Sequence, residues 1–472
     1  MRILQFNNYA DPVGGAEVYA LALTEALQRR GHEVAFFGTA PDREVHDPKL
    51  RVVRRPRYDP ALLMKDALVR EELGGFLSEF HPEVVHVHNV HALGLDVLDA
   101  LRLVGAPILQ TVHDFSLLCP NSWCVRGDGS TCPGGAGEQC FQHDCQKNYP
   151  FDPEVALTTL LKHRSLSGIV DLAVCPSRAL AERMQASGFP NVCHRNYFIE
   201  PISMDASSSP REDHSLLYIG RLEPEKGVGC LLEAMPKILA AESRASLSIV
   251  GGGSQAAPLE ARANELGLGQ RVRFMSHVPR AELGSFYARS ALCILPSIWS
   301  ENSPLVAYEC LFAGLPMIGS RVGGIPELVE EGRAGFTFTP RDPADLARAV
   351  LRFFALAPSE RDAMSQRMRA RAEEFRLGPH LAWLEEQYAQ LLEQGARTRA
   401  CRVAIDSDLL ALLEQFGQER ARLGRLFHEH LGYIRHLEST LGQTSKDASN
   451  AVPPAQGLLK RLTDAWPKAR RG

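Results

Sequence analysis

Short apolar runs rich in β-branched residues alternate along the chain with longer stretches in which apolar residues recur every three or four positions. The short runs predict strands, and the longer stretches predict helices. Strands that alternate with helices are typical of a parallel sheet built from βαβ units. In the first part of the chain, the predicted strands cover residues 3–7, 33–38, 84–88, 108–113 and 172–177.

The alternation is interrupted at residues 207–210, three serines followed by a proline, and then starts again. The second series of predicted strands covers residues 215–220, 247–250, 272–275, 293–296 and 316–319. This pattern predicts an α/β protein with two doubly wound Rossmann-like domains facing a central cleft, at 1–205 and 211–378. A helix at 379–396 is expected to cross back to the first domain. In such domains ligands bind at the carboxyl ends of the strands.

A different pattern begins after residue 396. Apolar residues recur at spacings of three and four between 409 and 441, which predicts a long amphipathic helix or a short coiled coil over 402–442. Packing on its own domain and homo-oligomerisation through 409–441 are alternative uses of this helix. Residues 443–472 predict a flexible linker and a basic amphipathic tail, either solvated or in contact with an anionic membrane.

Composition narrows the class of protein. Of the 472 residues, 45% are apolar and 23% are charged, which is ordinary for a globular protein, and the net charge of −4 argues against nucleic acid as a partner. No apolar run approaches the roughly 18 residues of a membrane span. The N-terminus predicts a strand and not a secretory signal. We therefore expect a cytoplasmic protein.

Glycines and cations follow the first strand of each predicted domain. Gly14 and Gly15 precede a helix, where glycine lets a ligand approach the backbone and the helix N-terminus attracts negative charge. Arg221 and Lys226 lie in the corresponding loop of the second domain. Two fixed cations there can neutralise the charge that develops on a leaving diphosphate, although a solvated loop would also explain them.

Carboxylates and a histidine follow other predicted strands. Glu301 and Glu309 lie before and on a predicted helix, where carboxylates can accept hydrogen bonds from sugar or ribose hydroxyls. His113 ends the strand at 108–113, so it is expected to face the cleft. Taken singly, each of these residues also fits a solvated or structural role.

In this order the segments resemble the GT4-type family of retaining glycosyltransferases, glycosyl transferases group 1, which have the GT-B fold. The resemblance covers about residues 1–395, and it is the ordered set that is specific. The set consists of Gly14-Gly15, Val112-His113-Asp114, Gly220-Arg221 with Lys226-Gly227, Glu301 to Glu309, and Gly323-Gly324 with Pro326-Glu327.

The resemblance implies roles for the matching residues. Arg221 and Lys226 would hold the donor's diphosphate, Glu309 the ribose hydroxyls and Glu301 the donor sugar. His113 would lie beside the transferred sugar. Further residues implied in donor binding are Gly14, Gly15, Met275, Val278, Asn302, Ser303, Pro304 and Leu305.

The resemblance also implies a reaction. A retaining hexosyltransferase would move a sugar from a UDP- or GDP-linked donor to a glycan or lipid-linked acceptor in polysaccharide or glycolipid synthesis. No DxD pair stands at a suitable strand end, so fixed cations and helix dipoles are expected to replace a metal, with no cofactor required. Another GT-B enzyme, such as a nucleotide-sugar epimerase or an inverting transferase, and a non-catalytic nucleotide-sugar-binding scaffold are the alternatives.

An insertion at 115–150 directly follows His113 and contains five of the eleven cysteines of the chain: Cys119, Cys124, Cys132, Cys140 and Cys145. Their spacing is looser than the CxxC pairs common in structural zinc sites. Disulfides are rare in reducing compartments. A structural zinc site, ordered free thiols and disulfides are the three alternatives.

Basic residues cluster at 51–57 and again at 460–471. Cations near an anionic leaflet contribute to membrane attachment. A peripheral location on the inner face of the membrane is therefore one expectation, and a solvated surface is the other.

Overall fold

The computed structural model describes residues 1–41, 50–56, 58–59, 62–132, 134–136, 139–145, 153–202, 211–276 and 278–398. The helix predicted over 402–442, the interface proposed at 409–441 and the linker and tail at 443–472 all lie outside these residues.

A seven-stranded sheet forms the first half of the described chain, and all of its strand pairs are parallel. Its order is β3-β2-β1-β4-β5-β6-β7. The apolar strands are buried on both faces, as a parallel sheet requires. The strands are β1 (Arg2–Tyr9), β2 (Glu33–Ala40), β3 (Leu50–Arg54), β4 (Val84–Val87), β5 (Ile108–Thr111), β6 (Leu172–Cys175) and β7 (Val192–His194).

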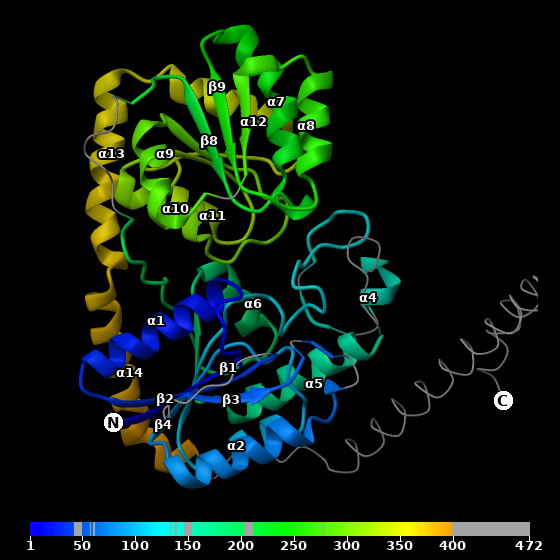
Figure 1. Ribbon diagram of the computed structural model, residues 1–472, viewed down its shortest axis with the longest axis vertical. Coiled ribbons are helices and arrows are strands. Elements are labelled where there is room, and N and C mark those ends of the chain that lie inside the picture. The colour runs from blue at the N-terminus through cyan, green and yellow to red at the C-terminus, as the bar shows by residue number, and fades with distance from the viewer. Residues whose placement is uncertain are drawn as a thin grey trace, which may run out of the picture. The chain divides into compact units, whose positions relative to one another are not determined.

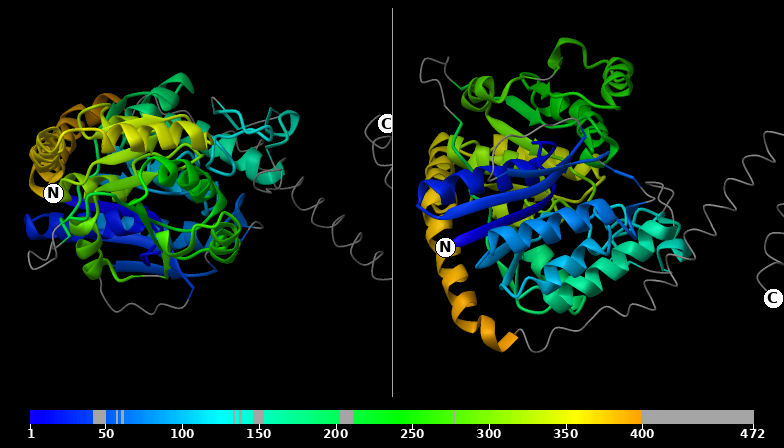
Figure 2. Two further views of the ribbon diagram at one scale, coloured as in Figure 1. Left: turned by 90° about the horizontal axis from the view of Figure 1, so that it is seen from above. Right: turned by 60° about the horizontal axis from the view of Figure 1, so that its bottom comes forward.

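Helices cover both faces of this sheet (Figures 1 and 2). The helix α1 follows β1 directly, so its N-terminus lies at the carboxyl edge of the sheet. The helices are α1 (Gly15–Arg29), α2 (Ala67–Phe80), α3 (Val97–Leu103), α4 (Gln139–Gln142), α5 (Pro153–Ile169) and α6 (Arg178–Ala186).

A six-stranded parallel sheet of order β10-β9-β8-β11-β12-β13 forms the second half. Its strands are β8 (Ser215–Ile219), β9 (Ser246–Val250), β10 (Val272–Met275), β11 (Leu292–Leu295), β12 (Met317–Ser320) and β13 (Gly335–Phe338). Its α-helices are α7 (Val228–Ala241), α8 (Ala256–Glu265), α9 (Leu283–Arg289), α10 (Leu305–Ala313), α11 (Ile325–Val329), α12 (Pro343–Phe354) and α13 (Pro358–Ala372). Its 3₁₀-helices are η3 (Pro224–Lys226), η4 (Gly269–Arg271), η5 (Arg280–Glu282) and η6 (Glu373–Phe375).

The helix α14 (Leu377–Thr398) returns from the second half and runs beside the first sheet (Figure 1). Its Glu385 accepts hydrogen bonds from Arg30 and His32. The Tyr388 hydroxyl lies 2.6 Å from Nδ1 of His86, inside the first domain. The helix therefore fastens the two halves together.

The strands predicted from the hydrophobic pattern all form, and β3, β7 and β13 join them at sheet edges. The edge strands β3 and β7 are only partly buried and lack a continuous apolar run, whereas the edge strand β13 is largely buried. The basic run predicted as a membrane contact lies largely in β3. Arg51 of β3 pairs with Glu72, and the buried Arg55, just after β3, pairs with Asp66.

Candidate functional site

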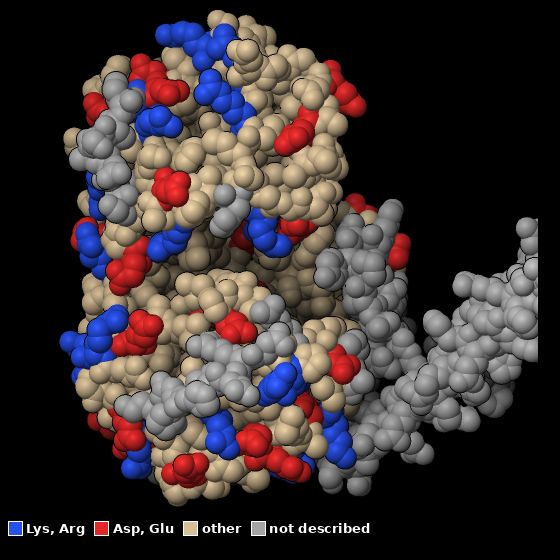
Figure 3. All heavy atoms as spheres, viewed as in Figure 1, with Lys and Arg blue, Asp and Glu red and all other residues tan. Residues whose placement is uncertain are grey.

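A cavity of about 980 Å³ opens where the carboxyl edges of the two sheets face each other. Figure 3 shows the surface hollowed between the upper and lower halves. We call this space the donor cavity. Its lining includes Gly14, Gly15, His113, Arg221, Val278, Glu301, Asn302, Ser303, Leu305 and Glu309.

Two helix N-termini meet at the donor cavity. Gly14 precedes α1 and Pro304 precedes α10, and neither helix has a side-chain cap. Gly15 and Leu305 face each other, since a Cβ on Gly15 would lie 3.7 Å from Cδ1 of Leu305. The amides of the first turn of α10 favour an anionic ligand there, whereas at α1 the buried carboxylate of Glu17 accepts from the amides of Gly14 and Glu17.

Lys226 and Glu301 form an ion pair across two loops of the second domain. Lys226 Nζ lies 2.6 Å from Oε1 of Glu301 and 5.0 Å from the centre of the Trp299 ring. Burial alone would raise the pKa of the Glu301 carboxyl. The charge of Lys226 and the hydrogen bonds from Lys226 and Ser297 outweigh burial and hold this pKa below its usual value. Glu301 is therefore an ionised, acceptor-only group in a buried place.

Arg221 is held more loosely. Its Nη2 lies 3.1 Å from Oε1 of Glu225, yet its side chain is 65% exposed while that of Glu225 is 8% exposed. One buried carboxylate thus anchors a guanidinium that reaches into the open space between the halves. A planar guanidinium can form two hydrogen bonds to one phosphate.

Glu309 lies on α10 and is buried beside two donors from neighbouring elements. The Tyr287 hydroxyl donates to Oε2 at 2.5 Å, and Arg280 Nε donates to Oε1 at 3.3 Å. Burial raises the pKa of Glu309, although both donors act in the opposite direction. Its two oxygens thus have fixed positions against the wall of the donor cavity.

His113 is buried in a stack of aromatic and imidazole rings. Its Nε2 lies 3.0 Å from Nδ1 of His88, and its Nδ1 lies 2.7 Å from the hydroxyl of Tyr197. Burial lowers the pKa of His113 to about 4, so the ring is neutral at neutral pH. Its ring orientation is fixed by His88, which directly follows β4, and by Tyr197, in the segment after β7.

Asn302 and Ser303 join the two halves. Asn302 Nδ2 donates to the carbonyl oxygen of His113 at 2.7 Å, and Asn302 Oδ1 accepts from Ser177 Oγ at 2.6 Å. The Ser303 hydroxyl donates to the Pro176 carbonyl at 3.3 Å. These side chains are engaged in the protein, while the segment that carries them lines the donor cavity.

The two glycines at 323–324 permit a close approach of backbones. A Cβ on Gly323, whose φ is +51°, would lie 1.9 Å from the Glu301 carbonyl oxygen. One on Gly324 would lie 2.0 Å from the Asn302 carbonyl oxygen and 2.7 Å from Cβ of Ser177. Any side chain at either position would displace Glu301 and Asn302 from the cavity.

Glu327 completes this junction by capping a helix of the other half. Its carboxylate accepts from the backbone amides of Arg178 and Ala179, each at 2.8 Å, at the start of α6. Hydrogen bonds to a charged carboxylate at a helix N-terminus are stronger than hydrogen bonds between neutral groups.

We expect Glu327→Ala to lower the free energy of unfolding by about 1–2 kcal/mol, because the α6 amides lose their acceptor. Chemical denaturation would measure the loss, and hydrogen exchange should rise locally at the start of α6. Glu260→Ala, at an exposed position on α8, is the matched control. Equal effects of the two substitutions would contradict the capping role.

Three of the implied donor residues lie off the cavity wall: Lys226, which contacts Glu301 from behind it, Met275 and Pro304. Met275 packs partly buried against the core of the second domain, and Pro304 precedes α10 without lining the donor cavity. Sequence reasoning missed Tyr287, Arg280 and His88, which hold the side chains of Glu309 and His113. His88 ends a predicted strand at the same sheet edge as His113, so its position in the sequence was enough to identify it as a candidate.

The insertion after β5 buries its five cysteine side chains. All described cysteines are free thiols. Cys119 Sγ donates to Asn121 Oδ1 at 2.9 Å, and an interaction with the Cys124 thiol lowers the pKa of Cys119 to about 6. Among the described residues, no three His, Cys, Asp or Glu side chains are grouped as metal ligands. Structural zinc stays a prediction that elemental analysis would test.

Comparison with known proteins identifies the family. The model of Glycosyltransferase Family 4 matches residues 13–195, and that of Glycosyl transferases group 1 matches residues 200–374. D-inositol 3-phosphate glycosyltransferase of Corynebacterium jeikeium is 30% identical over 425 residues, covering 84% of this chain and 98% of the relative. Glycogen synthase of Mycobacterium tuberculosis is 27% identical over 426 residues, covering 81% and 92%. The chain therefore belongs to the GT4 family of glycosyltransferases.

Solved structures show the same architecture. Sucrose-phosphate synthase from Thermosynechococcus elongatus aligns with a TM-score of 0.61 at 21% identity, over 83% of this chain and 99% of that one. Anabaena HepE in complex with UDP aligns with a TM-score of 0.62 at 16% identity, over 83% and 100%. The fold is GT-B, as the resemblance implied. In the described part of the chain, no helix is long and apolar enough to cross a membrane.

Proposed function

We propose that the protein is a retaining hexosyltransferase that moves a sugar from a UDP- or GDP-linked donor to a glycan or lipid-linked acceptor. The observation that carries this proposal is the ion pair of Lys226 with Glu301, which lines the donor cavity, together with the uncapped N-terminus of α10. A partly buried ammonium held in place by a carboxylate can stabilise a leaving diphosphate without reorganisation. HepE, of the same fold, is a UDP complex.

Each side chain has a role in this proposal. Arg221, Lys226 and the amides at the start of α10 bind the diphosphate, and Glu309 binds the ribose hydroxyls. Glu301 accepts from a sugar hydroxyl with the oxygen that Lys226 and Ser297 leave free. The departing phosphate oxygen takes the proton of the acceptor hydroxyl as that hydroxyl attacks the anomeric carbon from the face the diphosphate leaves. No protein nucleophile is assigned.

A screen of nucleotide sugars for hydrolysis and transfer tests the proposal. Turnover with retention of the anomeric configuration supports it, and inversion would identify an inverting enzyme. Conversion of the sugar without transfer would identify an epimerase, and binding without turnover would identify a scaffold. Failure of every donor to bind would refute the proposal.

We expect removal of divalent metal to leave the transfer rate within about twofold, because protein cations already occupy the place of the metal. Activity would be measured after EDTA treatment and again after addition of Mg²⁺ or Mn²⁺. Recovery of a lost rate by either ion would contradict metal independence. Structural zinc in the cysteine insertion would show instead as a change in thermal stability.

Attachment to an anionic membrane is a further part of the proposal. Among the described residues, the basic run at 51–57 supports such attachment little, because Arg51 and Arg55 have carboxylate partners. It rests on the basic residues at 460–471. Pelleting with anionic vesicles, with the full chain and a chain ending at 442, tests it. Light scattering of the same two chains and of one ending at 398 tests oligomerisation through 409–441.

A further inference from the structure

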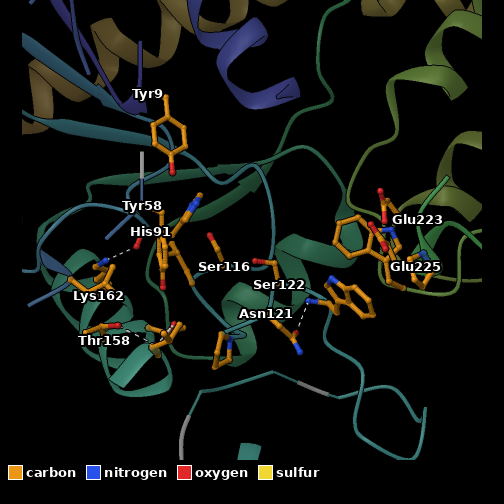
Figure 4. Close-up of a pocket in the computed structure, with 18 of the residues that line it drawn as sticks. Tyr9, Tyr58, His91, Ser116, Asn121, Ser122, Thr158, Lys162, Glu223 and Glu225 are labelled. Atoms are coloured by element: carbon orange, nitrogen blue, oxygen red, sulfur yellow. Dashed lines mark hydrogen bonds between the residues drawn. The ribbon is translucent and has the colours of Figure 1, made fainter. Parts of the chain in front are cut away.

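A second cavity, of about 920 Å³, adjoins the donor cavity and shares with it Tyr9, His91, Arg221 and Trp299. We call it the acceptor cavity. It runs from Tyr58, His91, Thr158 and Lys162 at one end, past Asn121 and Ser122, to Glu223 and Glu225 at the other (Figure 4). The donor roles proposed above do not use its far end.

The feature of interest at that end is a buried lysine. Lys162 lies on α5, is 3% exposed, and its Nζ donates to the carbonyl oxygen of His91 at 2.7 Å. An ammonium group has three donors, and in the described part of the chain no carboxylate lies within ion-pair distance of this one. Lysine is almost never buried without a partner of opposite charge.

The electrostatic surroundings of Lys162 make this burial unfavourable. Burial lowers the pKa of Lys162 to about 7, and the neighbouring cation Arg55 acts in the same direction. Arg55 has its own carboxylate, that of Asp66. His91 is neutral near pH 7, because burial lowers its pKa. Within the described residues, the ammonium of Lys162 therefore has no carboxylate partner at this end of the cavity.

The rest of the cavity gives a bound molecule an orientation. Glu223 and Glu225 at the opposite end would repel an anion, while hydroxyl and amide groups line the walls between. The Thr158 and Thr159 hydroxyls donate to the carbonyl of Val155, at 3.1 and 2.7 Å, so their oxygens can accept from a ligand. A polyhydroxylated molecule would lie with its anionic group at Lys162 and a hydroxyl toward the donor cavity.

We infer that the acceptor cavity binds an acceptor that carries a phosphate or carboxylate group, and that Lys162 binds this anion. The assignment of the molecule as the acceptor rests on the proposed function, whereas anion binding by Lys162 does not. A phosphate or a carboxylate would supply the same missing charge, so the experiment separates the two.

Calorimetric titration of the full chain with inorganic phosphate and, separately, with malonate tests the inference. The titrations use a Lys226→Met background, which removes the donor-site ammonium; Arg221 remains in every variant, so the contribution of Lys162 is the difference in affinity between the variants. Adding Lys162→Met should lower the affinity for the anion at least tenfold, and adding Lys162→Arg should preserve this affinity. Adding Lys237→Met, at an exposed position on α7, is the matched control and should change affinity less than twofold.

Thermal unfolding without anion separates this role from a structural one. Lys162→Met removes a buried charge, so its midpoint should equal or exceed that of the wild-type protein, while the KM for acceptor rises. A midpoint several degrees lower would identify Lys162 as a structural donor and overturn the inference. So would the absence of phosphate and malonate binding, or equal binding with and without Lys162. If no nucleotide sugar is used but anions still bind through Lys162, the proposed function fails and the anion site stands.

Discussion

Replacing Lys226 by methionine should lower kcat/KM for sugar transfer by about 10²–10³-fold, the loss typical when one fixed donor to a developing anion is removed. Nζ of Lys226 is largely buried between Oε1 of Glu301 and the Trp299 ring, where little solvent screens its charge. The loss should appear mainly in kcat, because the charge on the leaving oxygen grows in the transition state. Steady-state kinetics over donor concentration would measure it.

The same substitution should change the pH profile. In the wild-type protein Lys226 holds the pKa of Glu301 below its usual value, so the carboxylate stays ionised as pH falls. Without Lys226, burial prevails and the pKa of Glu301 rises, so the acid limb of kcat/KM moves to higher pH. Lys237→Met, exposed on α7, is the control and should leave both rate and profile unchanged.

Glu301→Gln alone and combined with Lys226→Met tests whether the pair acts as a unit. The two groups are in contact, so the combined loss should be smaller than the product of the single losses. A loss below tenfold for Lys226→Met at saturating donor would show that this lysine holds the loop and does not stabilise the leaving diphosphate.

Glu309→Gln should raise the donor KM and lower kcat/KM by about 10–100-fold, since hydrogen bonds to a charged group contribute about 1.5–3 kcal/mol. The Glu309 oxygens are fixed by Tyr287 and Arg280, so they are aligned before the donor arrives. Burial raises the pKa of Glu309, and donor affinity should therefore fall as pH decreases through that raised pKa. Nucleoside diphosphate binding, measured by calorimetry, reports this effect without catalysis.

Deoxynucleotides make the test of Glu309 specific. With the wild-type protein, a nucleoside diphosphate lacking a ribose hydroxyl should bind about tenfold or more weakly. In the Glu309→Gln variant, removal of the same hydroxyl should weaken binding of the nucleoside diphosphate only slightly further. Glu260→Gln on the exposed face of α8 is the matched control. Equal sensitivity of wild type and Glu309→Gln to the missing hydroxyl would exclude the ribose role.

Most of the fold could be predicted because its central strands are buried on both faces. Such strands need apolar, β-branched runs, and these stand out between amphipathic helices. The outer strands β3 and β7 could not be found in this way, since half-exposed strands such as Leu50–Arg54 mix apolar and charged residues. The sequence likewise placed the two glycines at 323–324 in a motif without showing what they approach.

Part of the candidate site could likewise be predicted from the sequence, and part could not. Arg221, Lys226, Glu301, Glu309 and His113 could be proposed from their places at predicted strand ends, because the ends of parallel strands share one sheet edge. The spatial partners of these residues could not be proposed. Lys226 and Glu301 are 75 positions apart, and Asn302 and His113 are 189 apart.

By itself, the sequence determined the local elements, the two-domain order and the residues that stand at strand ends. Hydrophobic periodicity and turn residues involve only a few neighbouring positions, so they can be recognised in the sequence. Only the tertiary structure decided that Lys226 pairs with Glu301, that Asn302 and Glu327 tie the halves together, and that Lys162 is buried with no carboxylate partner among the described residues. Charge, burial and hydrogen bonding at a site depend on segments far apart in sequence, and folding alone brings those segments into contact.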